Sequence, residues 1–228
     1  GRMAVAAKGA KRPTSNLRAL LMPFQRIHVS LGRGARDAAA TSEIHNLRGA
    51  EWGGGTPVAG GEALLSGFYL NELVMKLLAR DDPHPHLWDA YAGTLPRLGS
   101  AGHEAQALRA FELILLAETG HLPDLARQTA TQAAVEAERQ YVLRPEAGVA
   151  LARAEDDASL AGADLIALQS AIAVRDLERL GAACAGCEAA LRRLLRQLLA
   201  YHLGGAPLRT RELVRELQSL HLSAAPTR

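Results

Sequence analysis

Acidic side chains are absent from the first 36 residues of this chain, since the first carboxylate is Asp37. The same segment carries eight basic side chains: Arg2, Lys8, Lys11, Arg12, Arg18, Arg26, Arg33 and Arg36. The whole chain of 228 residues has 26 basic and 24 acidic residues, so the remainder is net negative. Charge segregated in this way favours a polyanion as the partner of the basic segment. A solvated basic surface without a partner is the alternative that charge alone leaves open.

Long apolar runs are also absent, because charged or polar residues interrupt even rich segments such as Leu113 to Leu116. A membrane-spanning helix needs about 20 apolar residues, so we expect no membrane role. The N-terminal residues contain no apolar region long enough for a secretory signal, and we expect a cytoplasmic protein. The 48% hydrophobic content is nevertheless enough to bury a core.

Cysteine is scarce, which excludes a disulfide framework. Cys184 and Cys187 have the spacing of half a zinc site, but no second pair of Cys or His accompanies them. They lie in a helical pattern, and we expect them to be small core residues.

Motifs for enzymatic chemistry are missing. The glycines at 53–55 are followed by Thr-Pro-Val, which excludes a nucleotide-binding loop, and Ser66 lies in a predicted helix where a hydrolase nucleophile does not occur. His84 and His86, near Asp81 and Asp82, could in principle hold a divalent cation. The same residues are typical of a helix stop followed by a helix start, and we favour that interpretation. The sequence therefore predicts no catalytic residue and no metal.

The basic segment has the pattern of a small β unit. Residues 2–7 predict a strand, and a Gly- and Pro-containing basic turn follows at 8–13. Residues 24–31 alternate apolar and polar side chains and predict a second strand. Gly32 to Gly34 then predicts a hairpin turn, with residues 35–44 as the partner strand.

A glycine-rich stretch at 51–61 predicts a boundary between two domains, 1–52 and 53–228. Beyond it the apolar residues recur at three- and four-residue steps. A helix is predicted from Glu62 until Asp81-Asp82-Pro83 stops it. Further helices are predicted over 85–98, 104–119, 159–172, 187–203 and 211–220, the last capped by Thr210. The polar segment 128–157 contains a predicted hairpin over 141–150, turned by residues 145–148. The chain is therefore predicted to be α+β.

Several segments, in order, resemble the RecO family of bacterial recombination mediators. They are Ala7 to Pro13 (AKGAKRP), Leu17 to Phe24 (LRALLMPF), Tyr69 to Leu73 (YLNEL), Asp82 to Pro85 (DPHP), Phe111 to Leu113 (FEL) and Leu203 to Leu213 (LGGAPLRTREL). The resemblance implies an N-terminal OB-fold followed by a mainly helical domain with a small hairpin insertion. Relatives begin earlier, so we expect the barrel to lack its first strand or strands.

The resemblance also implies a function in DNA repair and homologous recombination without enzymatic turnover. RecO-like proteins bind single- and double-stranded DNA, anneal complementary strands and act with RecR to load RecA onto DNA covered by single-strand-binding protein. We expect the DNA-binding residues to be Arg2, Lys8, Lys11, Arg12, Arg18, Arg26 and Arg33. Only two aromatic residues of this segment, Phe24 and Trp52, could stack on bases. DNA binding should therefore depend strongly on salt and discriminate little between bases.

Two further expectations concern the helical domain. RecO-like proteins bind the acidic tail of single-strand-binding protein there, and Arg192, Arg193 and Arg196 are the expected cations, although they could equally form a solvated face. Some relatives carry a four-cysteine zinc site after the helix ending near Gly120, but residues 128–143 contain no cysteine, so we expect no zinc cofactor. A basic-headed RNA- or ribosome-associated protein is the alternative function, because it would share the charge asymmetry.

Overall fold

The structure is a computed structural model that describes residues 2–32, 44–55, 60–100 and 102–223. These residues form an α+β fold with two small sheets and eight α-helices. In chain order the elements are β1 (Ala4–Ala6), α1 (Leu17–Leu20), β2 (Ile27–Gly32), β3 (Ile44–Trp52), α2 (Glu62–Leu77), α3 (Pro85–Thr94), the 3-10 helix η1 (Leu95–Gly99), α4 (Glu104–Glu118), β4 (Gln140–Arg144), β5 (Gly148–Leu151), β6 (Leu160–Ala161), α5 (Gly162–Ala173), α6 (Leu177–Ala185), α7 (Glu188–His202) and α8 (Arg209–Ser223).

The described residues up to Trp52, called the head, form an open three-stranded sheet in the order β1-β3-β2. β3 runs parallel to β1 and antiparallel to β2. The partner strand of β2 was predicted over 35–44, but β3 begins only at Ile44, and residues 35–43 lie outside the described part of the chain. The strand predicted to start at Phe24 starts at Ile27, because Phe24 has a φ of 67°, which no strand residue adopts.

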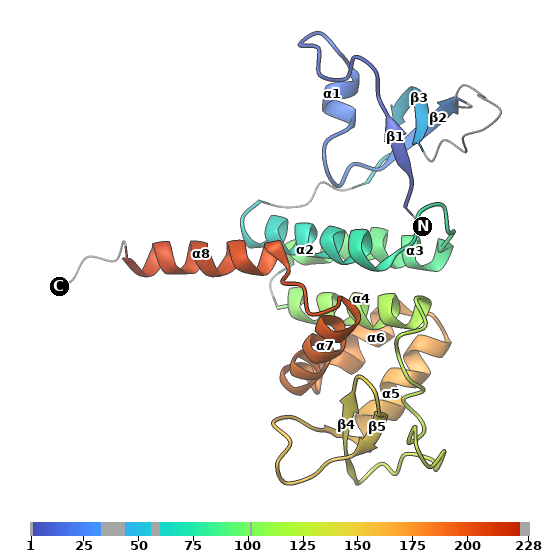
Figure 1. Cartoon of the computed structure of the whole chain (residues 1–228), viewed down its shortest axis with the longest axis vertical. Helices are drawn as coiled ribbons and strands as arrows, with labels where there is room; N and C mark the ends of the chain where they lie inside the picture. Colours follow the sequence, from blue (N-terminus) through green and yellow to red (C-terminus); the bar gives the residue numbers. More distant parts are fainter. Residues whose placement is uncertain (1, 33–43, 56–59, 101, 224–228) are drawn as a thin grey trace.

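The residues from 60 onward, called the body, are mainly helical (Figure 1). Its central helix is α4, where Phe111, Leu113, Leu115 and Leu116 are fully buried. α4 packs against α2, α3, α6 and α7, so its apolar residues must cover more than one face. α7 is instead amphipathic, with a buried face of five leucines: Leu191, Leu194, Leu195, Leu198 and Leu199.

The predicted helices over 104–119 and 187–203 are confirmed within one residue at each end. The helix predicted from Glu62 to the stop at Asp81 is confirmed at its start and ends earlier, at Leu77. The helix predicted over 85–98 is wrong in its last four residues, because Pro96 lacks an N–H for the α-helical pattern and the chain continues as η1 from Leu95. The helix predicted from Ser159 begins at Gly162, after β6 has paired with β4. α6 was not predicted as a separate helix.

The predicted hairpin is confirmed as β4 and β5, which pair from Tyr141 opposite Leu151 to Arg144 opposite Gly148. Figure 1 shows the head at one end of the molecule, the hairpin at the other, and α8 extending away from the side of the body. No helix formed by the described residues is both long and apolar enough to cross a membrane.

Candidate nucleic-acid interface

Five of the predicted DNA-binding residues are exposed on the head, and we call them the basic cluster: Lys8, Lys11, Arg12, Arg18 and Arg26. The first three lie on the turn after β1, Arg18 lies on α1 and Arg26 immediately precedes β2. Within the described part of the chain, none of the five forms an ion pair. Their charges are therefore available to a ligand.

The turn that carries Lys8, Lys11 and Arg12 is held by short-range backbone hydrogen bonds. The amide of Arg12 donates to the carbonyl of Gly9 at 3.1 Å, and Gly9 has a φ of +77°, which glycine adopts without strain. Arg12 folds back over this glycine, where an added Cβ would lie 3.8 Å from its Nε. These backbone hydrogen bonds thus hold the three basic residues of the turn in a defined arrangement.

Arg2 is placed differently from the basic cluster. Its Nε donates to the carbonyl oxygen of Leu78 at 2.7 Å, and its own carbonyl accepts from the amide of Asp81 at 2.8 Å. Arg2 therefore links the start of the head to the end of α2 through two hydrogen bonds. Arg33 lies outside the described residues.

The two predicted aromatic residues also differ in their surroundings. Phe24 packs on α2, with its ring centroid 5.1 Å from that of Phe68 in an edge-on arrangement. An added Cβ on Gly67 would lie 3.0 Å from the Phe24 ring, so that contact is tight. Phe24 is thus part of the junction between head and body, whereas Trp52 is 63% exposed at the end of β3.

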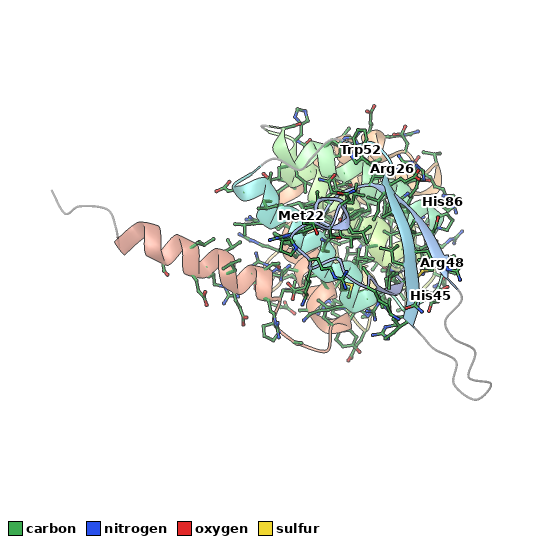
Figure 2. All side chains as sticks on the ribbon, turned by 90° about the horizontal axis from the view of Figure 1, so that it is seen from above. Met22, Arg26, His45, Arg48, Trp52 and His86 are labelled. Atoms are coloured by element: carbon green, nitrogen blue, oxygen red, sulfur yellow. The ribbon has the colours of Figure 1, made fainter. Side chains whose placement is uncertain are left out.

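Arg48 is an exposed cation of the head that the charge pattern did not reveal. It lies on β3, after the acid-free segment has ended and between Glu43 and Glu51 in the sequence, so counting charges gives no signal for it. Figure 2 shows Trp52 and Arg26 together at one end of the sheet, and Arg48 and His45 toward the other end. Cations therefore occur along the length of the head.

The three arginines expected to meet a protein partner are all exposed on the outer side of α7. Arg192 lies 4.0 Å from Glu188, and Arg193 donates to the carbonyl oxygen of Asp157 at 3.1 Å. Arg196 forms no ion pair within the described ranges. The amphipathic pattern of α7 thus places all three on its solvent side.

The side chains considered for a metal site point to different partners. His84 lies 3.1 Å from Asp82 and 3.7 Å from Glu118, whereas His86 contacts the guanidinium of Arg175. Asp81 faces His45 of the head at 3.7 Å. In the part of the chain that is described, no three His, Cys, Asp or Glu side chains are grouped as a metal ion would need.

Both cysteines lie in the core, as predicted, but they do not share a helix, since Cys184 lies on α6 and Cys187 is the N-cap residue of α7. Burial raises the pKa of the Cys184 thiol to about 12, and burial likewise raises that of Cys187 to about 11. Both are therefore neutral thiols near pH 7 and fill space among the leucines of α6 and α7.

A helical body bearing a small sheet with unpaired cations has the geometry of a candidate polyanion-binding protein, and comparison with known proteins identifies its family. The family model for the C-terminal part of recombination protein O matches residues 60–212. The chain is 48% identical over 220 residues to the DNA repair protein RecO of Variovorax paradoxus (strain S110), covering 92% of this chain and 82% of that protein. It is 43% identical over 208 residues to the DNA repair protein RecO of Burkholderia orbicola (strain AU 1054), covering 91% and 70%. The chain belongs to the RecO family.

Proposed function

We propose that this chain acts in DNA repair and homologous recombination as a mediator that binds single- and double-stranded DNA. In this proposal it anneals complementary strands and, with RecR, helps to load RecA onto DNA covered by single-strand-binding protein. Its membership in a family of DNA repair proteins supports the general function. The observation that carries the DNA-binding step is the basic cluster, whose five cations have no acidic partner in the described structure.

Within this proposal the head is part of an OB-fold. Parallel strands cannot be joined by a tight turn, and here β1 and β3 are parallel neighbours separated in sequence by α1 and β2. A mixed arrangement of this kind is compatible with a partly open, five-stranded Greek-key barrel. Such a barrel binds nucleic acids on a positively charged face.

DNA binding can be tested by replacing Lys8, Lys11 and Arg12 together with alanine. Each phosphate contact contributes about 0.7 to the slope of log affinity against log salt for single strands, so the slope should fall by about 2. Arg139 and Arg153, exposed residues of the body that pair with Glu136 and Glu155, are the control pair. An unchanged slope in the triple variant would remove the basic cluster from the DNA interface.

The same purified protein separates the proposed function from the RNA-binding alternative. A mediator should accelerate annealing of complementary strands covered by single-strand-binding protein without ATP. Structured RNA should compete poorly with single-stranded DNA, whereas preferential binding of RNA would favour the alternative.

We also propose that the outer face of α7 meets the acidic tail of single-strand-binding protein. Arg192, Arg193 and Arg196 offer three exposed cations on one side of α7, which suits the charge of an acidic peptide. Replacing all three with alanine should weaken binding of a fluorescent tail peptide, and unchanged affinity would exclude this face.

A zinc ion has no part in the proposal. The segment between α4 and β4 is held by polypeptide contacts instead: Thr129 donates its amide to the carbonyl of Val149 and accepts the Val149 amide through its hydroxyl, both at 2.9 Å. Metal analysis of the purified protein should therefore find no stoichiometric zinc.

A further inference from the structure

Arg48 occupies an irregularity in the pairing of β2 with β3. Ser30 lies opposite Gly49 and Leu31 opposite Leu47, so Arg48 has no residue opposite it. An extra residue of this kind is a β-bulge, which changes the direction in which a side chain leaves the sheet. The bulge therefore sets where the guanidinium of Arg48 lies.

Gly32, at the end of β2, provides the space that the Arg48 side chain occupies. An added Cβ at Gly32 would lie 2.5 Å from Nε of Arg48 and 3.3 Å from its Cδ and Cγ. Gly32 is consequently buried although it is the last residue of its strand, and Arg48 above it is exposed. The arginine thus lies along the sheet surface.

The surroundings of Arg48 are polar, and the described residues supply no counter-ion. Arg48 forms no ion pair within the described part of the chain. His28 and Ser30, which share a face with Gly32 because side chains alternate along a strand, are both exposed. The carboxylate nearest along β3, Glu51, is three residues away and lies opposite His28.

We propose that Arg48 binds a DNA phosphate and that the sheet face bearing Gly32, Ser30 and His28 extends the DNA path beyond the basic cluster. A guanidinium matches two phosphate oxygens at once, and one held along a surface loses less freedom on binding than one on a mobile side chain. The inference rests on the proposed DNA-binding function. It adds Arg48, a cation that the acid-free segment does not contain.

Three variants and one control test this inference in the full chain, with an oligothymidylate as the probe. Arg48→Ala should weaken binding about tenfold at low salt and lower the salt slope by about 0.7. Arg48→Lys keeps the charge but not the paired donors, so it should retain the slope and lose part of the affinity. Arg153→Ala removes an exposed body cation and should change neither quantity.

Gly32→Ala tests whether the position of the Arg48 guanidinium, and not only its charge, contributes to DNA affinity. The added methyl group must displace the Arg48 side chain while the net charge stays the same, so affinity should fall if position matters. Because the displaced atoms belong to the far end of a flexible side chain, this variant should fold, and thermal unfolding checks that it does.

The outcomes distinguish the inference from the function on which it depends. If the unmodified protein binds with a steep salt slope but Arg48→Ala and Gly32→Ala both behave as Arg153→Ala does, Arg48 is not a DNA contact and the proposed function stands. If the unmodified protein shows no salt-dependent binding, both proposals are overturned. Should Arg48→Ala fail to fold, Arg48→Lys and Gly32→Ala decide the question.

Discussion

The carboxylate of Glu72, in the middle of α2, accepts the hydroxyl hydrogen bond of Thr210 at 2.7 Å at the start of α8. It also accepts the backbone amides of Thr210 at 3.0 Å and Arg209 at 2.9 Å. The first amides of a helix have no partner within the helix, so Glu72 serves as the cap of α8 from another element. Thr210 was predicted to cap this helix, and that prediction is wrong because Thr210 lies inside the helix and donates to Glu72.

Replacing Glu72 with glutamine should loosen α8. The amide oxygen can accept fewer and weaker hydrogen bonds than the carboxylate, and loss of a cap costs about 1 kcal/mol. Chemical denaturation should show a decrease of that size in the free energy of unfolding. Glu216→Gln, an exposed substitution further along α8, is the control and should be close to neutral; equal effects of the two would contradict the cap.

The stability of the protein should depend on pH through the protonation of the Glu72 carboxylate. Burial alone raises the pKa of Glu72, but the hydrogen bonds from Thr210 and Arg209 and the charge of Lys76 outweigh it and hold the pKa below its usual value. A lowered pKa means that the stabilisation is complete above the unfolded pKa, about 4.3, and is lost as pH falls through the folded one. The stability difference between the protein and Glu72→Gln should be constant from pH 8 to 6 and shrink below about pH 4.

A buried polar network lies beneath the start of α8. Glu112, on α4, accepts two hydrogen bonds from Arg109, at 2.7 and 2.6 Å, and one from the hydroxyl of Tyr69 at 2.5 Å. Arg211 of α8 donates to the same tyrosine oxygen at 3.2 Å. The network thus joins three helices through one carboxylate.

Glu112→Gln should be strongly destabilising, because it removes the carboxylate that holds buried Arg109 through two hydrogen bonds and leaves only Glu188, whose Oε1 lies 3.6 Å from Nη1 of Arg109. Breaking a buried pair in this way costs about 3 kcal/mol, whereas an exposed pair contributes less than about 1 kcal/mol. Glu178→Gln is the matched control, since Glu178 pairs with Arg97 at 3.0 Å on the surface. Urea unfolding of both variants gives the comparison, and a small effect at Glu112 would show that the network tolerates a neutral partner.

The cysteines should be unreactive in the folded protein. Their raised pKa values keep both thiols neutral at pH 8, and only the thiolate attacks disulfide reagents. Labelling with an aromatic disulfide should be slow in buffer and complete for both thiols in denaturant. Glutathione under the same conditions provides the reference rate, and rapid native labelling of either residue would contradict the burial of the pair.

Some helices and strands of this chain could be predicted from local sequence patterns, whereas others depend on contacts between residues distant in sequence. The helices α2, α4 and α7 could be predicted because their apolar residues repeat with the helical period and glycine or proline marks their ends. β3 could not be predicted in its true position, because its residues alternate weakly and their pairing with both β1 and β2 is a long-range property. The break at Pro96 is different, because a proline within a helical pattern is a local signal, and the prediction of a helix over 85–98 did not use it.

The sequence by itself determined that the chain separates a basic, acid-free segment from a helical remainder, because charge and periodicity are read directly from residue order. Only the tertiary structure decided which cations are available. Arg2 donates a hydrogen bond to the carbonyl of Leu78, and Phe24 packs against Phe68 of α2. Arg48 lies along the sheet because of a β-bulge and the space left by Gly32. These assignments depend on residues distant in sequence meeting in space, and composition carries no information about such encounters.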